Sequence, residues 1–127
     1  MPRYFTVEEA NTALIIIRPI MEEIQTIRLK VLERQPEVWP VLQKAAGNGG
    51  SHEASLLALN FEQLDKLVHQ ILDMGVILKD INAGLLDFPS IRDDHEVYLC
   101  WLYGEEQIEF WHEIDAGFAG RTPIDPL

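Results

Sequence analysis

Apolar residues in the first third of the chain recur at steps of three and four residues, the period of one face of an α-helix. Thr6 and Glu9 have the spacing of a capping box, in which each side chain bonds a free backbone amide at the helix start. Pro19 interrupts the stripe and predicts a kink between Ile15 and Pro19. The stripe that predicts this first helix consists of Ala10, Leu14, Ile17, Ile20, Ile24, Ile27 and Val31.

A second stripe with the helical period follows a connection over residues 35–51 that is rich in glycine and proline. Gly75 is well placed to end the second helix, predicted over about 52–74, with a left-handed residue. Because each stripe can bury the other, we expect a long antiparallel helical hairpin over residues 6–74. The second stripe consists of Leu57, Phe61, Leu64, Val68 and Ile71.

Beyond Gly75 the spacing of apolar residues shortens towards two, the period of a half-buried β-strand. A polar stretch at 89–95 is predicted to connect the strands, and residues 117–127 are predicted to be irregular. The segment 76–81 also continues the second stripe, so it is predicted either as a strand or as the end of the helix. The predicted strands cover residues 76–81, 84–88, 96–103 and 107–114.

The predicted fold class is α+β, with a long antiparallel helical hairpin followed by a small antiparallel β-meander. A chain of 127 residues has the length of one domain. We therefore expect a single domain over 1–127, divided into the helical hairpin at 6–74 and the β-meander with its C-terminal loop at 76–127.

The two strongest strands determine which side chains share a face. Gly104-Glu105 suits a two-residue type II′ turn, which takes glycine first. Because side chains alternate along a strand, a slip of one residue would exchange the two faces. The turn predicts the pairs Trp101–Ile108, Leu99–Phe110 and Val97–His112 towards the helices, and the pairs Tyr98–Trp111 and Cys100–Glu109 on the outer face.

Composition excludes some classes of function. A net charge of −11 argues against nucleic-acid binding, because an acidic surface repels phosphates, and it favours a cationic ligand, a metal ion or a basic partner. No apolar run approaches the ~20 residues that span a bilayer, and no signal peptide is expected after Arg3. Cys100 is the only cysteine, which excludes an intramolecular disulfide and makes the cytoplasm the expected location.

Several motifs together resemble the signature of an uncharacterised bacterial and archaeal family, domain of unknown function 2203. The resemblance spans nearly the whole chain and is strongest over 84–121. It implies a fold and not a function, because the family has no established activity. The motifs are Tyr4-Phe5-Thr6, Glu9-Ala10-Asn11, Gly84-Leu85-Leu86-Asp87-Phe88-Pro89, Leu99-Cys100-Trp101, Gly104-Glu105, Trp111-His112 and Gly117-Phe118-Ala119-Gly120-Arg121.

His112 is the first candidate for chemistry, because an imidazole serves as a metal ligand or a general base. On the predicted register His95 lies diagonally beside His112, within reach of a shared divalent metal ion. The alternative is a core histidine bonded to a carboxylate or a carbonyl, because Phe110 and Ile114 surround it with apolar side chains.

Carboxylates crowd the predicted strands and offer ligands for a divalent cation, although a solvated acidic surface is the simpler interpretation. Cys100 is predicted to be a structural thiol, because an anion at its predicted neighbour Glu109 raises the pKa of a thiol. The acidic cluster consists of Asp87, Glu96, Glu105, Glu109 and Asp115.

The loop 117–121 is predicted to fold back against the sheet, so that Arg121 and His112 face one cleft. Asp87 or Glu105 would then orient one of these two side chains. Arg121 is expected either to hold a carboxylate or phosphate of a small ligand, or to pair with a carboxylate as part of the architecture.

Three functions remain open from the sequence. The leading interpretation is a homodimeric interaction or small-ligand-binding protein, because Tyr98 and Trp111 on the outer face would form an apolar patch that a second copy covers. One alternative is a small metal-dependent enzyme that uses His112 and nearby carboxylates. The other is a small-anion-binding module that uses Arg121.

Overall fold

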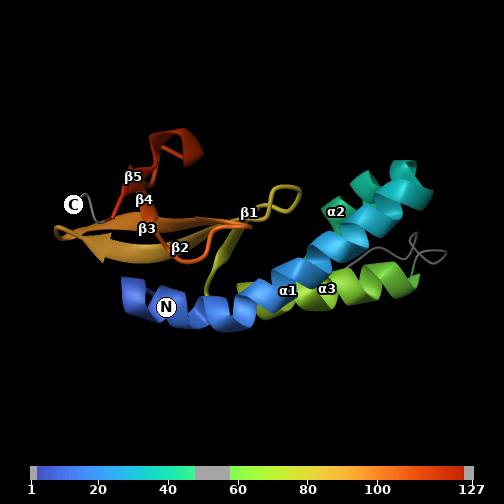
Figure 1. Ribbon diagram of the computed structural model, residues 1–127, viewed down its shortest axis with the longest axis horizontal. Coiled ribbons are helices and arrows are strands. Elements are labelled where there is room, and N and C mark those ends of the chain that lie inside the picture. Colours follow the sequence, from blue (N-terminus) through green and yellow to red (C-terminus); the bar gives the residue numbers. More distant parts are fainter. Residues whose placement is uncertain (1–2, 48–57, 125–127) are drawn as a thin grey trace.

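The computed structural model describes residues 3–47 and 58–124. Within these residues helices come first, and an antiparallel five-stranded sheet follows with its strands in sequence order (Figure 1). This arrangement confirms the predicted α+β class. The elements are α1 (Val7–Arg34), η1 (Pro36–Val38), α2 (Trp39–Ala45), α3 (Ala58–Leu72), β1 (Ile77–Asp80), β2 (Leu85–Arg92), β3 (His95–Leu102), β4 (Phe110–Glu113), η3 (Phe118–Gly120) and β5 (Thr122–Pro123).

The first helix, α1, begins with the predicted capping box. The Glu9 amide donates to Thr6 Oγ1 at 3.0 Å, and the Thr6 amide donates to Glu9 Oε1 at 2.9 Å. Pro19 lies inside the helix. Figure 1 shows that α1 changes direction along its length: its first turns lie against the sheet and its later turns run beside α3. The single helix α1 therefore packs against both the sheet and α3.

The predicted hairpin of two long helices is not found in that form. α1 has 28 residues, whereas the described part of the second helix, α3, has 15, and the short α2 occupies the connection between them. The predicted helix start near residue 52 lies outside the described residues. α3 ends at Leu72, and Gly75 follows with φ +88°, so the segment after it is free to form β1. No described helix is both long and apolar enough to cross a membrane.

The prediction of a polar connection at 89–95 is wrong, because β2 continues to Arg92 and a two-residue turn at Asp93-Asp94 joins it to β3. Both aspartates have positive φ, which aspartate tolerates better than most residues. Pro89 fits inside the strand because its carbonyl accepts from the Phe5 amide at 2.7 Å, on the side away from β3. The backbone nitrogen of Pro89, which carries no hydrogen, points to that same side. The proline therefore removes no hydrogen bond between β2 and β3.

The predicted register between β3 and β4 is wrong by one residue. The structure pairs Tyr98 with His112 and Leu99 with Trp111. The connection is a wide loop instead of a two-residue turn, because the Ile108 amide donates to Asn11 Oδ1 of α1 at 2.7 Å. The slip exchanges the faces of β4: Trp111 turns towards the helices, and His112 turns to the outer face. The predicted outer patch of Tyr98 and Trp111 is therefore not formed.

The two faces of the sheet are covered by different parts of the chain. The first turns of α1 lie against one face, and the C-terminal segment with η3 lies over the other (Figure 1). The outer face holds polar side chains that are nonetheless buried, at Asp87 and His112. The helical face contributes to an apolar core that includes Leu14, Ile17, Met21, Leu64, Ile71, Leu86, Phe88, Leu99 and Trp101.

Gly84, in the turn between β1 and β2, has φ +74°, and a Cβ there would lie 2.6 Å from Cβ of Tyr103. We expect Gly84→Ala to lower the free energy of unfolding by about 2–6 kcal/mol, because backbone strain and overpacking add. Gly104→Ala is the matched control, since its φ is +106° but nothing lies within 4 Å of the added Cβ. Its expected loss is about 1–3 kcal/mol. Urea denaturation measures both, and equal losses would contradict the packing at Gly84.

Candidate functional site

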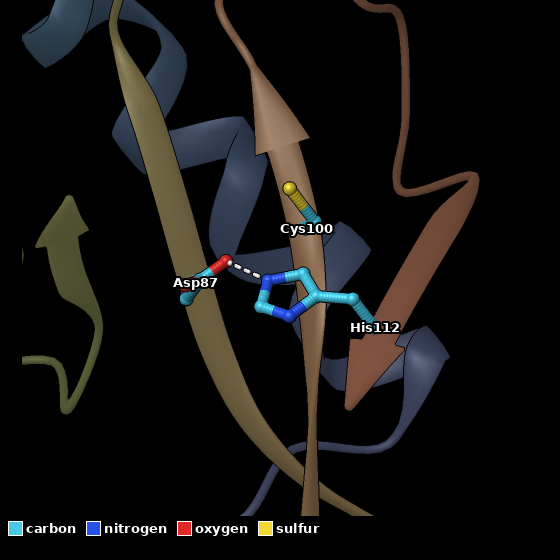
Figure 2. Close-up of side chains that lie close together, drawn as sticks. All are labelled: Asp87, Cys100 and His112. Carbon is cyan, nitrogen blue, oxygen red and sulfur yellow. Dashed lines mark hydrogen bonds and ion pairs between the residues drawn. The ribbon is translucent and has the colours of Figure 1, made fainter. Parts of the chain in front are cut away.

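Three side chains from three neighbouring strands meet on the outer face of the sheet. Asp87 of β2 lies opposite Cys100 of β3, and His112 of β4 reaches across towards Asp87 (Figure 2). One ligand atom of each residue lies within 4.8 Å of the other two. The exposed fractions are 1% for Asp87, 0% for Cys100 and 2% for His112. We call these three residues the Asp–Cys–His cluster.

Both ring nitrogens of His112 lie against oxygen atoms. Nδ1 is 2.7 Å from the Glu113 carbonyl oxygen, and Nε2 is 2.9 Å from Asp87 Oδ1 (Figure 2). A carbonyl only accepts hydrogen bonds, so Nδ1 carries a hydrogen. A second proton must lie between Nε2 and Oδ1, because two bare acceptors would repel each other. The ring therefore has no free nitrogen with which to act as a base towards Cys100.

The other two residues of the cluster, Asp87 and Cys100, differ in hydrogen bonding and in protonation. Asp87 Oδ2 is buried and has no hydrogen-bond partner among the described residues, which is unusual for a carboxylate oxygen. Burial raises the pKa of the Cys100 thiol to about 11, and the Asp87 carboxylate adds to this effect while Arg121 opposes it. Cys100 is therefore a protonated thiol at neutral pH and not a thiolate nucleophile.

The prediction of a structural thiol at Cys100 had the direction of this pKa right and its cause wrong. Burial is the largest cause, and Glu109, the predicted anionic neighbour, is exposed. In the observed register Cys100 pairs with Phe110. The register predicted from the sequence places Cys100 and His112 on opposite faces, whereas the observed register places both residues on the outer face.

Arg121 closes the site from the C-terminal side. Its Nη2 donates to Glu105 Oε1 at 2.7 Å and to the Cys100 carbonyl at 3.4 Å. The guanidinium lies 4.0 Å from the ring centroid of Phe110 and 4.7 Å from that of Phe118. The loop 117–121 thus folds back against the sheet. Glu105 pairs with the guanidinium and two rings flank it, which is the architectural arrangement given as one of the two alternatives for Arg121, while its buried Nε has no hydrogen-bond partner among the described residues. We call this arrangement the clamp.

His95 does not join His112, which corrects the prediction of a metal ion shared by these two residues. His95 Nε2 lies 2.9 Å from Glu113 Oε1 at the surface. His95 shares a face with Val97, whereas His112 pairs with Tyr98 and shares the opposite face with it. The carboxylates of Glu96, Glu109 and Asp115 are exposed, whereas the three residues of the Asp–Cys–His cluster are buried.

Arg121→Ala should lower the free energy of unfolding by about 1–3 kcal/mol, because it removes a partly buried ion pair and two ring contacts. At this size about 1 kcal/mol corresponds to roughly 3–6 °C in melting temperature, so thermal denaturation measures the loss. Arg121→Lys, which keeps the charge without the planar guanidinium, should recover only part of it. An unchanged melting temperature would contradict the clamp.

Comparison with known proteins agrees with the motifs that meet at the site. Asp87, Cys100, Glu105, His112 and Arg121 each come from a separate motif of the family resemblance, and the fold brings these residues into one array. No curated protein and no solved structure matches the chain. Residues 3–124 match the family described as "Uncharacterized conserved protein (DUF2203)". The chain therefore belongs to the DUF2203 family of uncharacterised conserved proteins.

Proposed function

We propose that this protein binds a divalent transition-metal ion of the zinc class through the Asp–Cys–His cluster. The observation that carries the proposal is the convergence of a carboxylate, a thiol and an imidazole, all buried, within 4.8 Å of one another. Oxygen, sulfur and nitrogen donors of these types are the ligands that zinc takes in proteins.

The distances suit such an ion after small movements. Bonds of about 2.0–2.3 Å place the ligand atoms of a tetrahedral zinc site about 3.3–3.6 Å apart. Asp87 Oδ1 and His112 Nε2, now 2.9 Å apart, would separate slightly, and Cys100 Sγ would approach them. Asp87 also offers Oδ2, which has no partner among the described residues. Three protein ligands leave a fourth position for a water molecule.

The hydrogen bond from His112 Nδ1 to the Glu113 carbonyl supports the same assignment. Histidine ligands in metal sites usually donate their second ring N–H to a carbonyl or carboxylate, which sets the tautomer and aims the other nitrogen at the ion. Here that bond is 2.7 Å long and leaves Nε2 directed at Asp87 and the cluster (Figure 2).

Charge balance favours a doubly charged ion. Binding would remove the proton between Asp87 and His112 and the thiol proton of Cys100, so the ion meets two negative ligands and one neutral ligand. The buried site is then neutral overall, which avoids the cost of an unpaired charge in the interior. Arg121 lies beside the site and lowers the pKa of the Cys100 thiol, which favours the thiolate that a metal ion needs, and Glu105 at 2.7 Å offsets part of its positive charge.

The structure bears unequally on the two alternatives expected from the sequence, the small-anion-binding module and the metal-dependent enzyme. A small-anion site at Arg121 has less support than the metal site, because Glu105 already occupies Nη2 of the guanidinium, although the buried Nε has no partner among the described residues. A metal-dependent enzyme at His112 is compatible with the proposed ion, with Asp87 and Cys100 as the ligands that replace His95. Self-association is a separate question that concerns other surfaces.

Cobalt(II) added to the purified protein should bind with a stoichiometry of one and produce a near-ultraviolet sulfur-to-cobalt charge-transfer absorption. Because Cys100 is the only cysteine, this absorption in the unaltered protein identifies its sulfur as a ligand, with no variant needed. Zinc added in excess should displace the cobalt and remove the absorption. Absence of the band at millimolar cobalt would overturn the proposal.

Single substitutions locate the other two ligands. His112→Gln and Asp87→Asn should each weaken cobalt binding at least tenfold, because each removes or weakens one donor. His95→Gln is the matched control, since it removes a histidine on the other face of the sheet, and it should leave the affinity unchanged. Loss of binding in His95→Gln, with retention in His112→Gln, would place the ion elsewhere.

Zinc affinity should rise with pH. Burial raises the pKa of the Cys100 thiol to about 11, so the thiol is still protonated throughout the neutral range and must release its proton to bind. We expect the apparent affinity to increase by about tenfold or more per pH unit between pH 6 and 8, as measured by competition with a chromophoric chelator. A flat pH profile would exclude the Cys100 thiolate as a ligand.

A further inference from the structure

A surface groove runs along the seam between α1 and α3, away from the Asp–Cys–His cluster. The helices are antiparallel: one hollow of about 400 Å³ is lined by α1 residues 19–27 and α3 residues 63–70, and a second hollow of about 370 Å³ is lined by α1 residues 8–16 and Met74. The first hollow lies between α1 and α3, and the second lies further towards the start of α1, where Met74 and Arg3 take the place of α3. We call this surface the seam.

Apolar side chains form the floor of the seam. Ile16 is 57% exposed in one hollow, and half-buried Ile20 and Ile27 line the other. These residues lie on one side of α1, because steps of four and seven residues return to the same face of a helix. A strip of this kind on a long helix is the usual contact surface of helical bundles.

Charges are distributed unequally across the seam. In the first hollow Glu23 stands on the α1 side and Lys66 on the α3 side. In the second hollow Glu8 and Glu9 stand on the α1 side. Arg3 stands on the α3 side there, because its side chain packs 3.2 Å from the Cβ position of Gly75 and its Nη1 donates to the Met74 carbonyl. In both hollows the acid belongs to α1 and the base lies on the α3 side.

We propose that a second copy of this chain docks on the seam, with a two-fold axis that runs along the groove. Rotation about that axis places α1 of one copy over α3 of the other at the same height along the seam. Glu23 of each copy then meets Lys66 of the other, and Glu8 and Glu9 meet Arg3. The surface is self-complementary, as an isologous dimer interface requires.

The charge pattern selects this partner over others. A purely basic helix would be attracted to Glu8, Glu9 and Glu23 but repelled by Arg3 and Lys66. A second copy matches both signs in both hollows, and its own Ile16 and Ile20 cover the apolar floor. The result is an antiparallel four-helix arrangement. This proposal does not depend on the metal ion, because the seam contains none of its ligands.

Sedimentation equilibrium of the full chain at tens of micromolar tests the dimer directly, since a standard-size interface holds at that concentration. We expect a dimer for the unaltered protein and a monomer for Ile20→Glu. Leu29→Glu is the matched control: Leu29 is 59% exposed on the same helix, but it points about 180° away from Ile20. It should leave the dimer intact. A monomeric unaltered protein would overturn the proposal.

A charge exchange tests the two-fold arrangement itself. Glu23→Lys and Lys66→Glu should each weaken dimerisation about fivefold or more, because each places like charges against one another across the seam. The double variant should recover the affinity, since every pair is restored with its signs reversed. A double variant no better than the single ones, or a dimer that is lost in Leu29→Glu and kept in Ile20→Glu, would assign the contact to another surface.

Discussion

The buried hydrogen bond between His112 and Asp87 is the interaction on which the sheet and its outer cover depend. Taking a carboxylate out of water costs several kcal/mol unless a partner satisfies it, and a histidine buried without partners is costly as well. The 2.9 Å contact satisfies one oxygen of Asp87, and the Glu113 carbonyl satisfies the remaining ring nitrogen of His112. Only one register of β2, β3 and β4 brings these groups together. A slip of one residue would turn His112 into the apolar core.

The C-terminal segment lies over the same face of the sheet as this polar pair (Figure 1). Phe118 and Phe110 flank the guanidinium of Arg121, and Glu105 neutralises its charge. Cys100, which pairs with Phe110 on this face, is fully buried, and its raised thiol pKa follows from the loss of solvent. Both ring nitrogens of His112 are occupied by the Glu113 carbonyl and Asp87, and the proposed metal site requires protons of the cluster to be exchanged for the ion.

Local signals in the sequence predicted the start of α1 and the order of the strands, but not the register of the sheet. The capping box of α1 depends on Thr6 and Glu9, which are neighbours in the chain, and it was read correctly. The path of β2 depends on Phe5, whose carbonyl accepts from Ser90 Oγ, 85 residues away in sequence. The register of β4 depends on Asn11, which binds the amide of Ile108, 97 residues away. No local pattern contains such contacts.

At the candidate site too, the residues could be predicted from local motifs, but the choice between His95 and Cys100 as the partner of His112 could not. Asp87, Glu105, His112 and Arg121 were named from their chemistry and motifs, and they lie in one array in the fold. Cys100 was dismissed as a partner of His112, and His95 was preferred, because the choice between them depended on a single residue of register. The signal that favours Cys100 was present in the sequence: it belongs to the same series of motifs as Asp87 and His112, whereas His95 lies outside all of them.

Nitrogen-15 NMR of the His112 ring tests most directly the claim that the proton shared with Asp87 is exchanged for a metal ion. Without metal, a hydrogen should be found on Nδ1 and a shared proton at Nε2. With one equivalent of zinc, the Nδ1 hydrogen should remain, held by the Glu113 carbonyl, while the Nε2 proton disappears and its resonance shifts to that of a metal-bound nitrogen. A ring spectrum that zinc leaves unchanged would contradict the account.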